Sequence, residues 1–573
     1  MKELKKDIQL FKDALLIGII GAFCAEIFIL LLDFISKYTL GKIAGYIPKD
    51  VINIFSTSTF HYNPWLVIVV ITIGGLISGF IVYTFAPEAE GHGTDAVIRA
   101  FHRTGGYLRP IVVPVKIITS AITIGTGGAA GREGPTALFS AGIGSIYANW
   151  RKASVQRRQT FVILGMAAGL SAVFKAPLGT AIFALEVLYI RSELDTKQLM
   201  FVIFGSLVAY TLTGFLFGWQ PLFDIPANLS VTEIDTFLLI IVFGIISGAF
   251  SILVPNVFYY TRDFFRKIPI KPHFKPAIGA FLVGIIAIWY PEVLGGGYGW
   301  IQAALDAELT LKLMLILIFL KLIAFSLTVG SGGSGGVFAP TLFVGAMLGG
   351  TFAYLTHQNI TVFALLGMAS VFSAAARTPL AGVIMVVEMS NGYSLLVPAI
   401  LAVFFAFFIH LLIVNVCKVK YITLYEAQLI DKNYSPIGQI EKLKDILLCY
   451  IDLIKLSPKQ IKDYKILSLL ESGTPIKLPT KEYLFFGEIM ENLKLREFDN
   501  AKYIKNVRVL YVFRKGEWLH PKEIQEIYKG DEVLVLGSKE DIQEIEKIFV
   551  PVSEVFSKLK AQELAIEGIK ETK

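Results

Sequence analysis

Long apolar stretches are the feature that most restricts what this 573-residue chain can fold into. They recur from Ala14 to Val416, and four of them approach or reach the roughly 20 residues that a helix needs to cross a bilayer. These four stretches are residues 14–32, 63–85, 236–254 and 395–414. A water-soluble domain cannot bury so much apolar surface, since 54% of the residues are hydrophobic and 17% are charged. We therefore predict an all-α polytopic membrane domain.

The first apolar stretch could be mistaken for a signal peptide. It is long, follows a charged N-terminal segment and lacks a small-residue cleavage site, so we interpret it as a membrane helix.

Basic residues are concentrated at a few points of the chain. They are Lys2, Lys5, Lys6, Lys12, the segments 151–158 and 262–275, Lys418 and Lys420. By the positive-inside rule these points face the cytoplasm, so we expect both termini to be cytoplasmic in a protein of the plasma (inner) membrane. This placement explains the net charge of +7 without a nucleic-acid partner.

The composition changes between Tyr421 and Pro436, after which Lys, Glu and Asp become frequent and long apolar runs stop. We expect a membrane domain over residues 1–430, followed by a small α+β cytoplasmic domain.

The membrane part contains an internal duplication. Residues 116–135 align without a gap on residues 321–340, and residues 164–187 align in the same way on residues 366–389. The two alignments have offsets of 205 and 202 positions, so both halves share one plan. Inverted repeats with Gly- and Pro-interrupted hydrophobic segments commonly place a substrate site between the halves, near the bilayer midplane.

The interrupted segments favour an anion as the substrate. A broken helix exposes unpaired backbone N–H groups, and the positive end of its dipole points at the break. Irregular backbone at membrane depth must be buried or line a cavity, and glycine lets the backbone come close to a ligand.

Other functional classes find little support. Gly330, Gly332 and Gly335 match GxGxxG, but the stretch leads into a membrane helix, so we expect no dinucleotide cofactor. The three cysteines Cys24, Cys417 and Cys449 lack metal-ligand spacing, so we expect no metal site. The sequence contains no HExxH, GxSxG or Walker motif, and we predict that the protein is not an enzyme.

Four motifs, in order, resemble those of the CLC family of chloride channels and chloride/proton exchangers. They are 91-GHGTD-95 in the place of a GSGIP-like signature, 131-GREGP-135, 336-GVFAP-340, and Tyr425 as a lone tyrosine on a short helix after the last span. The resemblance extends from about Phe11 to about Tyr425. It implies a homodimer in which each subunit has its own pore.

The resemblance also implies roles for individual residues. Glu133 corresponds to the gating glutamate, whose carboxylate occupies an anion site and leaves it to let chloride pass; a simple pairing of Glu133 with Arg132 is the alternative. The implied anion-binding residues are Gly91, His92, Gly93, Thr94, Gly131, Arg132, Gly134, Gly336, Val337, Phe338 and Tyr425. The Tyr425 hydroxyl would donate a hydrogen bond to the central anion, or Tyr425 would be an interfacial tyrosine.

Two positions depart from the family pattern. His92 stands where chloride-selective members have serine, which puts chloride preference in doubt; its side chain either offers an N–H to the anion or points away. Val187 occupies the inner proton site, where exchangers have a second glutamate, and valine cannot carry a proton. The preceding Glu186 and its repeat partner Glu388 more naturally fix helix packing.

Residues 507–521 indicate a strand, a tight turn at Lys515 and Gly516, and a second strand, and residues 530–549 indicate a buried strand and a helix capped by Ser538. With its motifs R-x-G, P and GDxxxxxGS in this order, the tail resembles a TrkA-C (RCK C-terminal) regulatory domain over residues 475–550. We expect a helical linker over residues 431–474, with an amphipathic helix at 438–454, and a charged helical tail over 551–573. The tail either binds a small regulatory ligand or only dimerises.

Together these observations predict transport of chloride or a similar small anion, with Val187 favouring a channel over an anion/proton antiporter. An inverted-repeat transporter of another solute is the alternative from a different class, as is a potassium transport component regulated by its tail. The sequence has no repeated TVGYG-like filter.

Overall fold

The structure is a computed structural model that describes residues 2–46, 62–190, 195–226 and 229–429, and parts of the chain beyond residue 475. Those later parts are residues 476–478, 483–490, 493–494, 507–514, 517–521, 524–545 and 549–551. The chain divides into two compact units, Met1–Ile430 and Asp431–Lys573.

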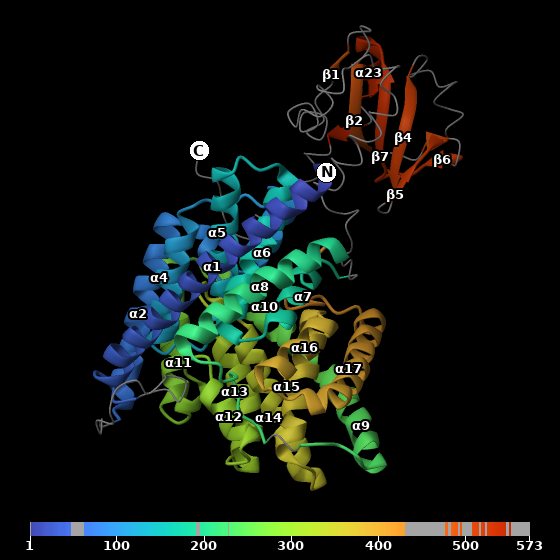
Figure 1. The fold of residues 1–573 in the computed structure, drawn as a ribbon. Helices are drawn as coiled ribbons and strands as arrows, with labels where there is room; N and C mark the ends of the chain where they lie inside the picture. The colour runs from blue at the N-terminus through green and yellow to red at the C-terminus, as the bar shows by residue number, and fades with distance from the viewer. Residues whose placement is uncertain are drawn as a thin grey trace. The chain divides into compact units, whose positions relative to one another are not determined.

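The first unit is built of helices (Figure 1). In chain order they are α1 (Lys2–Ser36), α2 (Pro64–Phe85), α3 (Thr94–Arg103), α4 (Val112–Gly125), α5 (Glu133–Trp150), α6 (Val155–Phe174), α7 (Pro177–Glu186), α8 (Thr196–Phe217), α9 (Ile234–Ser251), α10 (Leu253–Lys267), α11 (Lys275–Ala287), α12 (Tyr298–Leu305), α13 (Leu311–Gly330), α14 (Phe338–Thr356), α15 (Ile360–Ala376), α16 (Pro379–Met389) and α17 (Leu396–Cys417). A π-helical turn, Lys37–Gly41, extends α1, and the 3₁₀ turns Pro87–Ala89, Pro272–Phe274, Pro291–Val293 and Tyr393–Leu395 lie between helices.

Seven helical segments of the described residues are long and apolar enough to cross a membrane. They are Asp7–Gly41, Pro64–Phe85, Thr196–Phe217, Ile234–Lys267, Leu311–Gly330, Phe338–Thr356 and Tyr393–Cys417. Three of the four stretches predicted as spanning helices lie inside these segments, and the fourth, 63–85, begins one residue before Pro64. The prediction of these spanning helices is confirmed. The prediction of an all-α membrane domain is confirmed with it.

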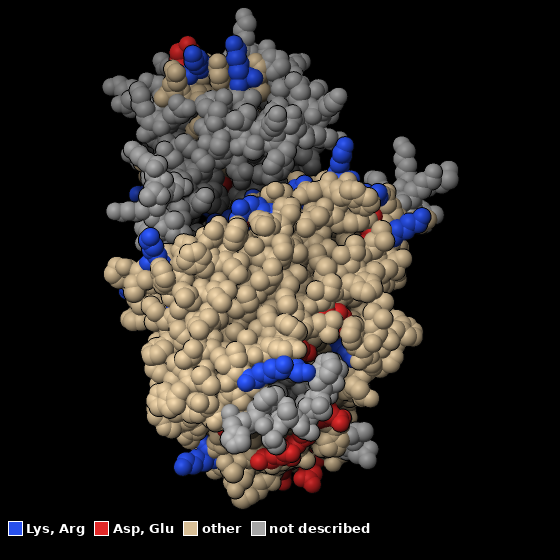
Figure 2. Space-filling model, turned by 90° about the vertical axis from the view of Figure 1, so that its left-hand side faces the viewer, with Lys and Arg blue, Asp and Glu red and all other residues tan. Residues whose placement is uncertain are grey.

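The outer surface of this unit suits a lipid environment. Phe80 on α2, Phe215 on α8 and Phe404 on α17 are each more than half exposed. Figure 2 shows a broad surface with few charged side chains, which lie mostly towards the ends of the unit. In water such a surface would drive aggregation, whereas in a bilayer it faces acyl chains.

The internal duplication is visible in the packing of the helices. α5 packs along α6, and their repeat partners α14 and α15 pack along each other in the same way. A Cβ atom at Gly144 would overlap the carbonyl oxygen of Phe161, and one at Gly349 would overlap that of Phe363. These four residues occupy equivalent repeat positions, so close backbone contact through glycine is built into both halves.

Both halves also break the chain in the same way after the second of these helices. Lys175 and Arg377 adopt left-handed conformations, each with a φ of 55°, at the ends of α6 and α15. Two residues later Pro177 and Pro379 begin α7 and α16. Proline lacks an N–H group and suits the first turn of a helix. In each half, therefore, the left-handed residue ends one helix and the proline starts the next.

The second unit contains a six-stranded and a two-stranded antiparallel sheet and one short helix among its described residues. Its strands are β1 (Ile476–Lys477), β2 (Tyr483–Ile489), β3 (Leu493–Lys494), β4 (Arg508–Arg514), β5 (Glu517–Leu519), β6 (Glu526–Ile527), β7 (Glu532–Gly537) and β8 (Phe549–Pro551), and its helix is α23 (Lys539–Ile545). The main sheet has the order β1-β2-β7-β4-β5, β8 also pairs with β2, and β3 pairs with β6.

Several predictions for this unit are confirmed. β4 and β5 form the expected antiparallel pair, and β7 is the buried strand. Ser538 caps α23 by accepting the backbone N–H of Asp541 at 3.2 Å. The turn at Lys515 and Gly516, the linker 431–474 with its amphipathic helix, and the tail after residue 551 lie outside the described residues, while residues 549–551 form β8.

Candidate functional site

The two glycine-rich breaks meet each other. The backbone N–H of Gly131 donates to the carbonyl of Gly336 at 2.8 Å, and the N–H of Gly336 donates to the carbonyl of Gly131 at 2.6 Å. α5 begins two residues after Gly131, and α14 begins two residues after Gly336. The N-termini of these two helices therefore lie at one place, where their N–H groups and dipoles favour negative charge.

The loop that contains 91-GHGTD-95 joins the same meeting point. The N–H of Gly335 donates to the carbonyl of Gly91 at 3.2 Å, and a Cβ atom at Gly134 would overlap the carbonyl oxygen of His92. Gly93 has a φ of 85° and lies against the carbonyl of Gly134, so a side chain there would be strained and crowded. Three segments that are distant in sequence thus come together, as predicted from their motifs.

The carboxylate of Glu133 lies between the two breaks. Glu133 is 3% exposed, and the hydroxyl of Tyr298 donates to its Oε1. Its Oε2 lies 2.7 Å from the place where a Cβ atom of Gly336 would be, and it would overlap a Cβ at Gly131. Arg132 and the backbone N–H groups of Glu133 and Ala339 add favourable electrostatic interactions. The carboxyl group of Glu133 thus lies where the N-termini of α5 and α14 meet.

Arg132 does not simply pair with Glu133. Its guanidinium stacks over the ring of Tyr298 at 4.5 Å from the ring centre, and it also interacts with the buried Glu26. Its position before the first turn of α5 places its backbone, as well as its charge, beside the site.

His92 and Tyr425 lie beside each other. Their ring centres are 5.6 Å apart, and Nε2 of His92 lies 3.2 Å from Oδ2 of Asp95. Thr94 is buried and begins α3, while the second carboxylate oxygen of Asp95 accepts the N–H of Ala427 at 3.2 Å. Asp95 therefore connects the histidine loop to the segment that contains Tyr425.

The expected short helix around Tyr425 is absent from residues 421–429. Side chains take up backbone N–H groups there, because Tyr425 N donates to Oγ1 of Thr423 at 3.3 Å and Ala427 N donates to Asp95. The segment forms turns, and these contacts hold it against α3.

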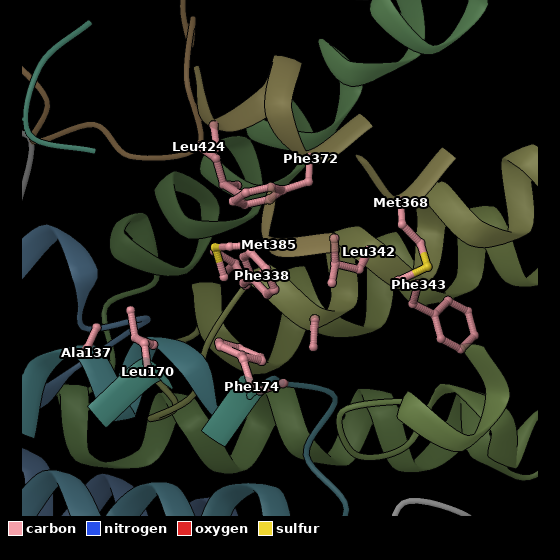
Figure 3. Close-up of a cluster of buried hydrophobic side chains, with 14 of the residues drawn as sticks. Ala137, Leu170, Phe174, Phe338, Leu342, Phe343, Met368, Phe372, Met385 and Leu424 are labelled. Atoms are coloured by element: carbon pink, nitrogen blue, oxygen red, sulfur yellow. The ribbon is translucent and has the colours of Figure 1, made fainter. Parts of the chain in front are cut away.

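Phe338 contributes an apolar wall. Its ring centre is 4.3 Å from that of Phe372 and 5.1 Å from that of Phe174. Figure 3 shows the Phe338 side chain in a cluster with these two rings and Met385. The Phe338 side chain is thus packed among aromatic rings at the start of α14.

A family model described as "Voltage gated chloride channel" matches residues 74–411. The chain belongs to the CLC family. A relative from Salmonella arizonae, named H(+)/Cl(-) exchange transporter ClcA, is 32% identical over 343 residues, which are 57% of this chain and 71% of the relative. The corresponding protein of Salmonella newport is 31% identical with the same coverage.

Solved CLC structures share the fold. A CLC-type fluoride/proton antiporter superposes with a TM-score of 0.63 at 23% identity, covering 74% of this chain and 98% of that one. A slow cyanobacterial Cl−/H+ antiporter also gives 0.63, at 20% identity, with 72% and 96% covered. Membership of the CLC family establishes anion transport across a membrane as the function class.

Val187, which the resemblance assigns to the inner proton position, is fully buried at the end of α7. The neighbouring Glu186 accepts the N–H groups of Leu380 and Ala381, at 3.3 and 2.8 Å, at the start of α16. These contacts agree with the interpretation of Glu186 as a packing residue, which stays a prediction.

Glu388 makes the reciprocal contacts. It accepts the N–H groups of Leu178 and Gly179, at 3.2 and 2.7 Å, at the start of α7. Each half of the CLC domain therefore caps a helix of the other half with a carboxylate.

Tyr298 and the two buried lysines were not predicted as site residues. Lys116 donates to the carbonyls of Ala89 and Gly91, at 2.8 and 2.7 Å, and Lys321 donates to those of Val293 and Gly295, at 2.8 and 2.9 Å. The sequence marks all three, since Lys116 and Lys321 match in the repeat 116–135 and 321–340, and residues 86–101 align with residues 290–305 at an offset of 204. That alignment places Tyr298 opposite Thr94 and marks a third repeated pair of loops.

Proposed function

We propose that this CLC protein exchanges a small anion, chloride in the first place, for protons, and that Glu133 couples the two movements. The observation that carries the proposal is the Glu133 carboxylate between the N-termini of α5 and α14, in contact with both breaks. An ionised carboxylate competes with an external anion for that position. A protonated one has lost the charge that holds it there and can leave, taking its proton.

The remaining site residues have supporting roles in this proposal. Backbone N–H groups around Gly131–Gly134 and Gly336–Phe338 bind the anion, together with the loop Gly91–Thr94 and the Tyr425 hydroxyl. The arrangement supports these roles because the segments converge and leave no room for side chains at Gly93 and Gly134.

The exchanger replaces the channel as the leading function because the most similar relatives above carry exchanger names. The channel remains the second candidate, and one observation favours it. Val187 is apolar and buried where exchangers have a proton-carrying glutamate.

Proteoliposomes separate the two. Vesicles loaded with high chloride are diluted into low chloride, with valinomycin and potassium to clamp the voltage, and the external pH is recorded. An exchanger takes up protons as chloride leaves, so the medium becomes alkaline even against an imposed pH gradient. Chloride efflux without proton uptake would establish a channel. Movement of potassium or an amino acid without any anion would contradict both.

The preferred anion is tested in the same vesicles by comparing chloride, nitrate and fluoride. We expect chloride and nitrate to move faster than fluoride, which holds its hydration shell more strongly.

Three further features stay predictions. They are a homodimer with one pore in each subunit, cytoplasmic termini, and a TrkA-C-like second unit that binds a small regulatory ligand or only dimerises. Light scattering of the detergent-solubilised protein tests the dimer, and ligand-induced changes in chloride flux test the regulatory unit.

A further inference from the structure

His92 and Asp95 form a buried pair at the anion site. Nε2 of His92 lies 3.2 Å from Oδ2 of Asp95, and both side chains are less than a tenth exposed. The carboxylate is fixed on its other side, because its Oδ1 accepts the N–H of Ala427. Such a pair sets the orientation of the imidazole ring and decides which nitrogen carries the hydrogen.

The tautomer follows from these contacts. A carboxylate only accepts hydrogen bonds, so Nε2 must be the N–H that faces Asp95, and the neutral ring has its lone pair on Nδ1. Nδ1 is buried and has no hydrogen-bond partner among the described residues. A buried polar atom without a partner is costly, and this one would repel an anion.

The ring stands at the proposed pathway. It contacts the ring of Tyr425, and the backbone of His92 packs against Gly134, next to Glu133. A proton on Nδ1 would turn the unsatisfied acceptor into a donor. The positive ring would be balanced by Asp95, and an anion beside Nδ1 would satisfy the new N–H.

We propose that His92 and Asp95 form a second protonation site of the pathway, at which a proton on Nδ1 and a bound anion each favour the other. The inference rests on the proposed function and adds to it a residue that links anion affinity to pH independently of Glu133. By linkage, protonation raises anion affinity and the anion raises proton uptake by the same factor.

Other titratable or charged groups lie around the pair on every element packed against it. They are Arg99 on α3, Lys116 on α4, Glu133 on α5, Tyr259 and Arg262 on α10, and Tyr425 and Glu426 in the last segment. Of these, the Glu133 carboxylate is itself proposed to exchange protons. The test is therefore made in a Glu133→Gln background, which removes that titration.

The experiment is calorimetric titration of chloride into the full-length, detergent-solubilised Glu133→Gln protein between about pH 5 and 8, the range in which histidines ordinarily change charge. Buffers with different ionisation enthalpies reveal protons taken up on binding. We expect uptake that approaches one proton per anion at the alkaline end. Affinity should fall there by up to about tenfold per pH unit, because binding consumes a proton.

Added substitutions identify the proton acceptor. His92→Asn places an amide near the position of Nδ1 but does not titrate, so proton uptake and the pH dependence of affinity should both disappear. Asp95→Asn removes the balancing charge, so the change in affinity should move to lower pH. His357→Asn is the matched control, since His357 is exposed in a left-handed position that asparagine tolerates. With this substitution, the pH dependence of chloride affinity should equal that of the Glu133→Gln protein alone.

Two results would overturn the inference: pH-independent affinity in Glu133→Gln, or undiminished proton uptake after His92→Asn. Either would leave the proposed exchange intact if the wild-type protein still moves protons against chloride. Failure of the wild type and of Glu133→Gln to bind any anion would instead contradict the proposed function itself.

Discussion

The two halves of the membrane unit share their backbone at the proposed anion site and differ in the side chains that they bring to it. Gly131 and Gly336 occupy equivalent positions and bond to each other, and Lys116 and Lys321 each hold two loop carbonyls. Two positions further along the repeat, however, the first half has Glu133 and the second has Phe338.

This difference separates two tasks. A symmetric scaffold of helix N-termini provides a place that favours anions, and needs no particular side chain beyond glycine. The asymmetric residues make one half ionisable and the other apolar, and Tyr298 of the second half bonds to Glu133 of the first. We infer that the backbone shared by the two repeats binds the anion, whereas the side chains that differ between them couple anion movement to protons.

The largest effect is expected where the halves differ most. Glu133→Gln should abolish proton movement while chloride still flows, because the amide cannot carry a proton. Phe338→Leu should retain proton coupling and change only the rate of chloride transport. Flux assays with simultaneous chloride and pH electrodes give both values. Equal loss of coupling in the two variants would break the proposed division between the halves.

The next effect should be the same in both halves. Lys116→Met and Lys321→Met should each lower the free energy of unfolding by about 2–6 kcal/mol, because two buried carbonyls lose their donor at about 1–3 kcal/mol each. Thermal unfolding in detergent measures the loss. Lys312→Met, at an exposed position of α13, is the control and should be close to neutral. A large loss from only one of the two buried lysines would show that the loops are not equivalent.

A smaller effect, again similar in the two halves, is expected at Glu186 and Glu388, whose carboxylates each cap a helix of the other half. Glu186→Gln and Glu388→Gln keep the shape of the side chain but replace a carboxylate that accepts two N–H groups by a neutral amide. Each should therefore lower the free energy of unfolding by about 1–3 kcal/mol. Proton coupling should remain. If Glu186→Gln were fully stable yet moved no protons, Glu186 would be a proton carrier and its assignment to packing would be wrong.

The smallest effect should come from the contact that crosses between the halves. Tyr298→Phe removes one hydrogen bond that holds the Glu133 carboxylate, worth about 0.5–1.5 kcal/mol, so the carboxylate should leave the site about 2–10 times more readily. Chloride turnover measured at constant pH should rise accordingly. A fall in turnover with an unchanged fold would mean that Tyr298 assists release of the carboxylate.

Much of the site could be predicted because the repeat marks it. Residues that keep Gly and Pro at matching positions, such as Gly131 and Gly336, have to be breaks, and broken helices attract anions. The fold class followed from the apolar stretches for a similarly general reason, since water cannot solvate them.

What could not be predicted depends on contacts between distant segments. The segment at Tyr425 forms turns in place of the expected helix, and its Ala427 N–H bonds to Asp95, more than 300 positions earlier. The side chain of Arg132 stacks on Tyr298, and Nε2 of His92 lies 3.2 Å from Oδ2 of Asp95. Local sequence carries no record of these partners, although the third pair of repeated loops would have pointed to Tyr298.

The central claim, that the two breaks form an anion site occupied by the Glu133 carboxylate, is tested most directly by anomalous diffraction from bromide-soaked crystals of Glu133→Ala and wild-type protein. We predict a bromide peak between Gly131 and Gly336 in Glu133→Ala, at the place of the missing carboxylate, and no peak at that place in the wild type with the carboxylate in position. Bromide bound elsewhere in Glu133→Ala, with none between the breaks, would contradict the account.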